Sequence, residues 1–189
     1  MQTQTKLRKH LLMLTQMGVM AAISVVLVYL VHFPIIPSAP FLEYDPADIM
    51  LILGAFIYGP VAGLILTAVV CVVQGLTVSA NSGFIGIMMH FFATGGYVLV
   101  AGLTYKFSKK ENINIIIAML SGIIFMCASM VLWNYIFTPI FMGVPRDSVV
   151  KMLVPVIVPF NLIKAGINSF LAFLLFKSVG VYILEFRQD

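Results

Sequence analysis

Three polar residues at helical spacing interrupt an apolar stretch near the end of the sequence. Asn161, Lys164 and Asn168 are three and four positions apart, which places them on one face of a helix that turns by about 100° per residue. Hydrocarbon cannot satisfy such a face, so it must point at other polar groups, water or a ligand. Two amides and one ammonium predict a site for a neutral ligand with a heterocyclic ring or several carbonyl groups.

Lys164 is the member of this face whose position needs the strongest explanation. A charged side chain at the centre of a membrane helix costs about 2.5–3.5 kcal/mol on insertion scales, so it normally faces the protein interior and has a partner. Binding of a ligand is one explanation. The alternatives are an ion pair with a purely structural role and a side chain that extends to the outer membrane surface.

Two further positions are candidates for the same site. Asn134 either bonds a neighbouring helix or contacts the edge of a ligand. Trp133, next to it, either stacks on that ligand or belongs to the aromatic belt at the membrane surface. Glu43 has no local structural role, and we expect it to pair with Lys164, to bind a ligand hydroxyl or to remain a solvated loop charge.

Polar residues in the middle of the chain predict helix contacts. His90, Thr94 and Tyr97 are spaced to share one helical face. No second histidine or carboxylate stands at metal spacing in that stretch, so no metal site is expected there. We interpret Gln74 in the same way, as a residue that bonds a neighbouring helix.

The sequence lacks the motifs of enzymes and of ATP-binding proteins. It contains no G-x-x-x-x-G-K-[S/T], H-E-x-x-H or G-x-S-x-G, and its apolar stretches hold no carboxylates to couple transport to a cation. Cys71 and Cys127 match no metal or redox spacing and are expected to be small buried hydrophobes. We therefore predict no catalytic residues, no bound metal and no cofactor.

The elements that position these residues are membrane-spanning helices. Hydrophobic residues make up 61% of the 189 residues and charged residues only 10%, against about a quarter charged in soluble domains. A span needs about 20 mostly apolar residues, and the apolar runs are long enough for several. We predict a single all-α domain over 1–189. Its six predicted spans are 11–31, 47–58, 61–77, 84–105, 113–137 and 156–176.

Two longer loops interrupt the predicted spans. The first, 32–46, is apolar and rich in proline, which prevents a regular helix. It ends at a predicted helix start, with Asp45 as N-cap, Pro46 in the first helical position and Asp48 near the positive end of the helix dipole. Because both carboxylates have these roles, we discount them as ligand groups. The second loop is predicted over 138–155.

The basic residues set the predicted orientation. With both termini in the cytoplasm, most Lys and Arg side chains lie inside, and only Arg146 and Lys151 fall outside, as the positive-inside rule requires. This orientation explains the net charge of +4 without a nucleic-acid partner. The inner basic residues are Lys6, Arg8, Lys9, Lys106, Lys109, Lys110, Lys177 and Arg187.

The stretch FLEYDPADIMLILGAFIYGP, residues 41–60, resembles the riboflavin-specific substrate-binding (S) components of energy-coupling factor (ECF) transporters. The resemblance implies a bacterial plasma-membrane protein that binds riboflavin at the outer face and delivers it inward. It also implies partners, namely a transmembrane coupling protein and two ABC ATPases, which alone would bind ATP. The residues expected to bind the vitamin are Glu43, Asn134, Asn161, Lys164 and Asn168, with Phe41, Leu42 and Tyr44 in a lid formed by loop 32–46.

The resemblance also implies a docking face for the coupling protein. The family uses an Ala-x-x-x-Ala motif on its first span, and the matching region here offers the small-residue pairs Gly18/Ala22 and Ala21/Val25. Two rival functions stay open on sequence alone. One is an S component for another small vitamin, and the other is an intramembrane enzyme or scaffold.

Overall fold

Helices make up nearly all of the chain described by the computed structural model, which covers residues 2–108, 111–180 and 182–183. The helices are α1 (Gln2–Leu30), α2 (Asp48–Tyr58), α3 (Pro60–Leu76), α4 (Gly83–Phe107), α5 (Glu111–Met142), α6 (Arg146–Met152) and α7 (Val158–Leu175). Three short helical turns are η1 (Ala80–Ser82), η2 (Leu153–Ile157) and η3 (Phe176–Gly180). Two short strands, β1 (Phe33–Pro34) and β2 (Glu43–Tyr44), pair in antiparallel fashion inside the first loop.

The six predicted helices are present, although they differ in length. Four helical stretches are long and apolar enough to cross a membrane: Leu7–Leu30, Ala80–Phe107, Asn114–Met142 and Arg146–Gly180. α2 and α3 are shorter, as their sequences predict. α2 is buried inside the protein, since its residues Leu51 and Ile52 are at most 1% exposed. Neighbouring helices therefore cover it.

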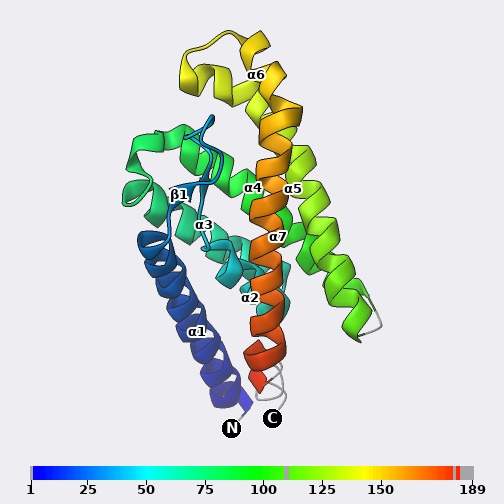
Figure 1. Cartoon of the computed structure of the whole chain (residues 1–189). Coiled ribbons are helices and arrows are strands. Elements are labelled where there is room, and N and C mark those ends of the chain that lie inside the picture. Colours follow the sequence, from blue (N-terminus) through cyan, green and yellow to red (C-terminus); the bar gives the residue numbers. More distant parts are fainter. Residues whose placement is uncertain (1, 109–110, 181, 184–189) are drawn as a thin grey trace.

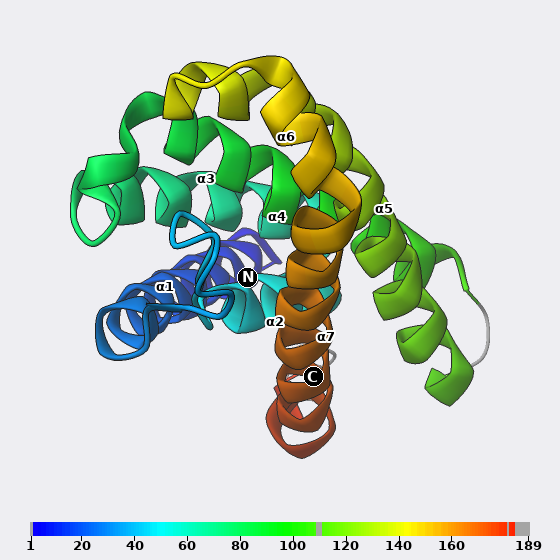
Figure 2. The ribbon, with the colours of Figure 1, turned by 45° about the horizontal axis from the view of Figure 1, so that its top comes forward.

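Four helices, α1, α3, α4 and α7, pack against α2, which lies between α1 and α7 (Figures 1 and 2). Small residues allow this close packing. A Cβ atom at Gly63 of α3 would lie 2.7 Å from both Ala55 Cβ of α2 and Val98 Cγ1 of α4. The beginning of α1 and the end of α7 lie at one end of the molecule, and the first loop and α6 lie towards the other (Figure 1).

The predicted second loop, 138–155, is wrong, because most of it is helical. α5 continues to Met142 with Pro139 inside it, and the break is confined to residues 143–145. Gly143 provides the turn with a positive φ of 64°, a conformation that favours glycine. The apolar pattern marks the membrane depth, whereas helical hydrogen bonding continues into polar sequence beyond it. For the same reason α1 begins at Gln2 and not at residue 11.

The predicted start of the second helix is close to the observed one. α2 begins at Asp48, with Ala47 in the capping position. The predictions of Asp45 as N-cap and of Pro46 in the first helical position are therefore wrong, and no side chain caps α2. Asp45 Oδ1 instead accepts a hydrogen bond from the Ala47 backbone N–H at 3.1 Å, so this carboxylate supports the turn that precedes the helix. Of the basic residues used for the predicted orientation, Lys109, Lys110 and Arg187 lie outside the described residues.

Candidate ligand-binding site

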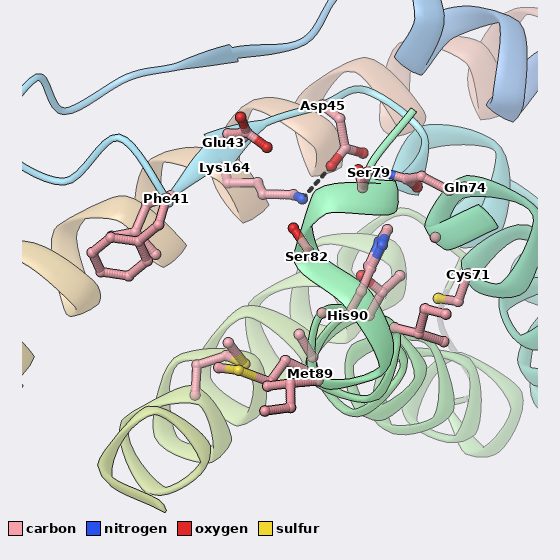
Figure 3. Close-up of a pocket in the computed structure, with 18 of the residues that line it drawn as sticks. Phe41, Glu43, Asp45, Cys71, Gln74, Ser79, Ser82, Met89, His90 and Lys164 are labelled. Carbon is pink, nitrogen blue, oxygen red and sulfur yellow. Dashed lines mark hydrogen bonds and ion pairs between the residues drawn. The ribbon is translucent and has the colours of Figure 1, made fainter. Parts of the chain in front are cut away.

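A cavity of about 150 Å³ lies where five parts of the chain meet (Figure 3). Its walls come from the first loop, the end of α3, the beginning of α4, the second half of α5 and the beginning of α7. Because successive long helices run in opposite directions, the end of one lies beside the beginning of the next. The cavity therefore sits towards the end of the molecule that carries the loop and α6.

A buried ion pair connects the loop to α7 at this cavity. Lys164 Nζ donates a hydrogen bond to Asp45 Oδ2 at 2.7 Å, and Asp48 Oδ2 lies 3.9 Å from the same nitrogen. The side chains of Lys164 and Asp45 are only 8% and 5% exposed, so Lys164 does not extend to the membrane surface. The sequence analysis discounted Asp45 as a ligand group because of its local role at the helix start, but the structure shows that Asp45 also lines the cavity.

Glu43 has a different partner from the one that the sequence suggested. Its Oε2 lies 2.9 Å from His32 Nε2, next to the short β1–β2 pairing, whereas Lys164 pairs with Asp45. Both residues line the cavity. His32 lies two residues after the end of α1, so this contact joins the two ends of the loop at the edge of the site.

Asp48 is the centre of a second polar cluster that lies against the first. Its Oδ1 accepts a hydrogen bond from Thr94 Oγ1 at 2.9 Å and lies 3.3 Å from His90 Nε2. Its Oδ2 accepts a hydrogen bond from Asn168 Nδ2 at 3.3 Å. The predicted helix contacts of His90 and Thr94 are therefore confirmed, although their partner is a carboxylate that the sequence reserved for the helix dipole. The contact of Tyr97 is confirmed too, since its hydroxyl lies 2.7 Å from Ser169 Oγ of α7.

Three groups able to bind a metal come together here, which the sequence did not predict. Ligand atoms of Asp45, Asp48 and His90 all lie within 4.8 Å of one another. The Lys164 ammonium already contacts both carboxylates and supplies the positive charge that a cation would bring. The carboxylates come from the loop and α2, so a search within one span could not find them.

Asn168 supports the site from behind. It is fully buried, its Nδ2 donates to the Asp45 backbone oxygen at 3.0 Å, and its Oδ1 accepts from the Tyr44 hydroxyl at 3.0 Å. Burial raises the pKa of Tyr44 above its usual value, and the Asp45 carboxylate raises it further, so the hydroxyl remains a donor. Asn168 and Tyr44 thus hold the end of the loop against α7.

The two other predicted amides line the cavity. Asn134 Nδ2 donates to the Met130 backbone oxygen, and Asn161 Nδ2 donates to the Ile157 backbone oxygen, each at 2.8 Å. Asn134 Oδ1 accepts from Thr138 Oγ1 at 2.8 Å. Asn134 therefore bonds within its own helix, and both amides are held in fixed orientations at the cavity wall.

Apolar side chains form much of the remaining wall. Met89, Met126, Met130 and Phe160 line the cavity, and methionine adapts well to flat apolar groups. Trp133 has a packing role between α4 and α5, where its ring stacks on Phe92 with centroids 4.3 Å apart.

The loop covers the cavity with two of the three predicted lid residues. Phe41 and Leu42 line it, whereas Tyr44 turns towards α7. Leu42 also packs with Val149 and Ile157 in a separate apolar cluster that joins the loop to α6 and η2. The loop is therefore held by apolar contacts as well as by the ion pair.

The predicted docking face on α1 is only partly accessible. Gly18 and Ala22 are exposed, and a Cβ atom at Gly18 would meet nothing within 4 Å. Ala21 and Val25 are half-buried, and Ala21 packs against the core. Large exposed apolar side chains, among them Val19, surround the accessible pair.

Comparison with known proteins places this architecture among membrane transporters. Residues 12–176 match a family model described as the ECF transporter, substrate-specific component. A solved structure described as the S component of a bacterial ECF transporter superposes with a TM-score of 0.77 at 27% sequence identity, covering 90% of this chain and 96% of that chain.

Curated relatives of similar length share about a quarter of their residues with this chain. The riboflavin transporter RibU of Staphylococcus aureus is 26% identical over 90% of this chain and 91% of its own length. RibU of Streptococcus thermophilus is 28% identical over 82% of this chain and 77% of its own length. The riboflavin transporter FmnP of Bacillus subtilis is 27% identical over 93% of this chain and 95% of its own length.

Proposed function

This chain belongs to the substrate-specific components of ECF transporters, and we propose that the substrate it binds is riboflavin. It is a multi-pass membrane protein and a transporter subunit, not an enzyme. Two facts support riboflavin: the curated relatives are named riboflavin transporters, and the cavity combines an apolar wall with fixed amides and an ammonium. The lining of the cavity is the observation in this chain that supports the proposal.

The isoalloxazine ring of riboflavin fits the two kinds of wall. Its faces are apolar and pack against Met126, Met130 and Phe160, while Asn134, Asn161 and Lys164 bond its polar edge. Glu43 lies at the cavity edge, where a ribityl hydroxyl reaches it. Asn168 contributes through Asp45, whose backbone oxygen it holds. Each asparagine amide nitrogen uses one N–H for a backbone oxygen, so a ligand that lacks these polar groups would leave the second N–H without an acceptor, which gives the site its discrimination.

The first loop acts as the lid of this site. The cavity is about 150 Å³, whereas small-molecule pockets usually measure roughly 300–1,000 Å³. Riboflavin therefore enters when the loop moves outward and is enclosed when Phe41 and Leu42 return. The contacts that must rearrange are the Lys164–Asp45 ion pair and the His32–Glu43 pair.

Transport requires partners, because this chain has no ATP-binding motif. We propose that both termini are cytoplasmic, and that the exposed Gly18/Ala22 face of α1 docks the ECF transmembrane coupling protein. Two ABC ATPases bound to that protein supply the energy. Ala21 and Val25, which are half-buried, lie beside this face and allow the two helix backbones to approach each other.

The direct test is the colour of the protein purified from its own host without added ligand. Bound riboflavin makes it yellow and fluorescent, and heat should release one flavin per chain. Lys164→Met should abolish that colour. The double variant Asp45→Asn, Lys164→Met is the matched control for folding, since it leaves no unpaired buried carboxylate at Asp45. A folded double variant that retains flavin with unchanged affinity would remove Lys164 from the site, and a colourless wild-type protein that binds no added riboflavin would refute the proposal.

A further inference from the structure

Gln74 carries a buried oxygen that no protein group satisfies. The residue is 3% exposed, it lines the cavity near the end of α3, and its Oε1 has no hydrogen-bond partner. Within the described residues it is the one buried side-chain nitrogen or oxygen in that condition. Buried polar atoms are nearly always paired, so this oxygen calls for a partner that comes from outside the chain.

The backbone around Gln74 is fixed, so the side chain cannot escape to water by a change in the helix end. The Gln74 backbone oxygen accepts hydrogen bonds from the N–H groups of Thr77 at 3.2 Å and Ser79 at 2.9 Å. The next residue, Gly75, is so close to α4 that a Cβ atom there would overlap Ile87. This arrangement holds the amide at the cavity wall. The sequence predicted that Gln74 bonds a neighbouring helix, but its Oε1 has no hydrogen-bond partner in the described residues.

The two ends of the cavity differ in chemistry, and Gln74 belongs to the hydroxyl-lined end. Ser79 and Ser82 line the cavity on the turn that follows α3. Figure 3 draws Ser79 beside Gln74 and Asp45, and Ser82 below the end of the Lys164 side chain. The methionines of α5 and the amides of Asn134 and Asn161 form the other wall. A ligand with one apolar ring and one polar chain would lie with its chain towards α3.

We infer that Gln74 is a ligand-binding residue that pairs with a hydroxyl group of the substrate's polyol chain. An acceptor such as Oε1 needs a donor. The edge of an isoalloxazine ring presents mainly acceptors, which suit Lys164 and the asparagine amides, whereas the ribityl chain presents several hydroxyl donors. A hydroxyl group both donates and accepts, so it satisfies an amide in either orientation. This assignment rests on the proposed function and adds the residue that recognises the ribityl chain.

The test compares two flavins on one variant. Gln74→Leu keeps the approximate shape of the side chain and removes the amide. Fluorescence titrations measure its affinity for riboflavin and for lumiflavin, which has a methyl group in place of the ribityl chain. Loss of one neutral hydrogen bond should weaken riboflavin binding about three- to tenfold, and lumiflavin binding should stay unchanged.

Gln16→Leu provides a matched control far from the cavity. Gln16 Oε1 accepts a hydrogen bond from the Tyr58 hydroxyl at 2.8 Å, so this variant should lower the melting temperature of the ligand-free protein and leave riboflavin affinity unchanged. Gln74→Leu should do the reverse, because its oxygen has no partner to lose: the ligand-free melting temperature is maintained or raised while riboflavin affinity falls.

Each other outcome has a distinct meaning. Equal weakening of both flavins by Gln74→Leu, or no weakening of either, overturns the assignment of Gln74 to the polyol chain while the proposed function stands. A fall in the ligand-free melting temperature with unchanged affinities shows that Gln74 is structural and also overturns it. Failure of the wild-type protein to bind either flavin refutes the proposed function itself, and this assignment with it.

Discussion

Replacing Lys164 with methionine should destabilise the ligand-free protein by about 3–5 kcal/mol, the range measured when one partner of a buried ion pair is removed. This range for buried ion pairs applies because the side chains of Lys164 and Asp45 are less than a tenth exposed and their charged atoms are 2.7 Å apart. After the substitution, the Asp45 carboxylate keeps a single hydrogen bond, from the Ala47 N–H. Asp48 loses the nearest positive charge as well, since its oxygen lies 3.9 Å from the Lys164 nitrogen.

Thermal unfolding in detergent provides the assay. For chains of about this length, 1 kcal/mol shifts the melting temperature by about 2–4 °C, so Lys164→Met should lower it by roughly 6–20 °C. The double variant Asp45→Asn, Lys164→Met should recover most of this loss, because a neutral amide does not need a cation. Asp45→Asn alone leaves the ammonium without its closest acceptor. Its melting temperature should lie between those of Lys164→Met and the double variant.

The double-mutant cycle distinguishes an ion pair from simple packing. If the melting temperature of the double variant falls by the sum of the shifts in the two single variants, Lys164 and Asp45 contribute independently. That result would refute the reasoning from the ion pair. A shift of less than about 2 °C for Lys164→Met would refute it equally, since it would mean that water reaches the carboxylate.

Three further outcomes follow from other parts of the fold. Burial holds the pKa of Tyr44 above its usual value, so unfolding releases its proton more readily; the stability that this residue contributes is complete below about pH 10 and is lost as pH rises further. The difference in melting temperature between wild type and Tyr44→Phe, which loses the bond to Asn168, should therefore narrow at alkaline pH. Gly63→Ala should cost about 1–3 kcal/mol through overpacking against Ala55, whereas Gly18→Ala, with open space around it, should leave the melting temperature nearly unchanged. Gly18→Leu should keep flavin binding and weaken co-purification of the coupling protein, and normal co-purification would contradict docking at that face.

Composition and periodicity were sufficient to predict the helical architecture, because each span must satisfy its backbone within itself. The end of the fifth predicted span shows what composition and periodicity did not predict, because α5 continues to Met142. Pro139 and Gly143 together indicate a loop, yet only Gly143 interrupts the helix. A proline inside a helix removes one backbone donor and usually costs about 3 kcal/mol or more, but membrane helices tolerate it where neighbouring groups satisfy the freed backbone oxygen. The cost depends on neighbours that the sequence does not place.

The candidate site was predictable in proportion to how local its signals are. Asn161 and Lys164 follow from the helical period, and both line the cavity. Asp45 was discounted because its role at the helix start is real, but a carboxylate has two oxygens: one accepts the Ala47 N–H and the other accepts Lys164. Gln74 gave no signal of a ligand role, because an unpaired oxygen is a property of the packed structure. Sequence rules of this kind assign one role to a residue, and buried polar residues often have two.

The ion pair also determines how substrate binding and the lid depend on each other. An ammonium has three donors, and the short bond to Asp45 uses one of them, while Lys164 also lines the cavity. A carbonyl group of the ligand can therefore bond to Lys164 without displacing Asp45. Such a ligand adds a contact to the closed arrangement and removes none, so it favours the closed lid over the open one by its differential affinity for the two. In the proposed site, the same lysine would bind the substrate and hold the loop that encloses it.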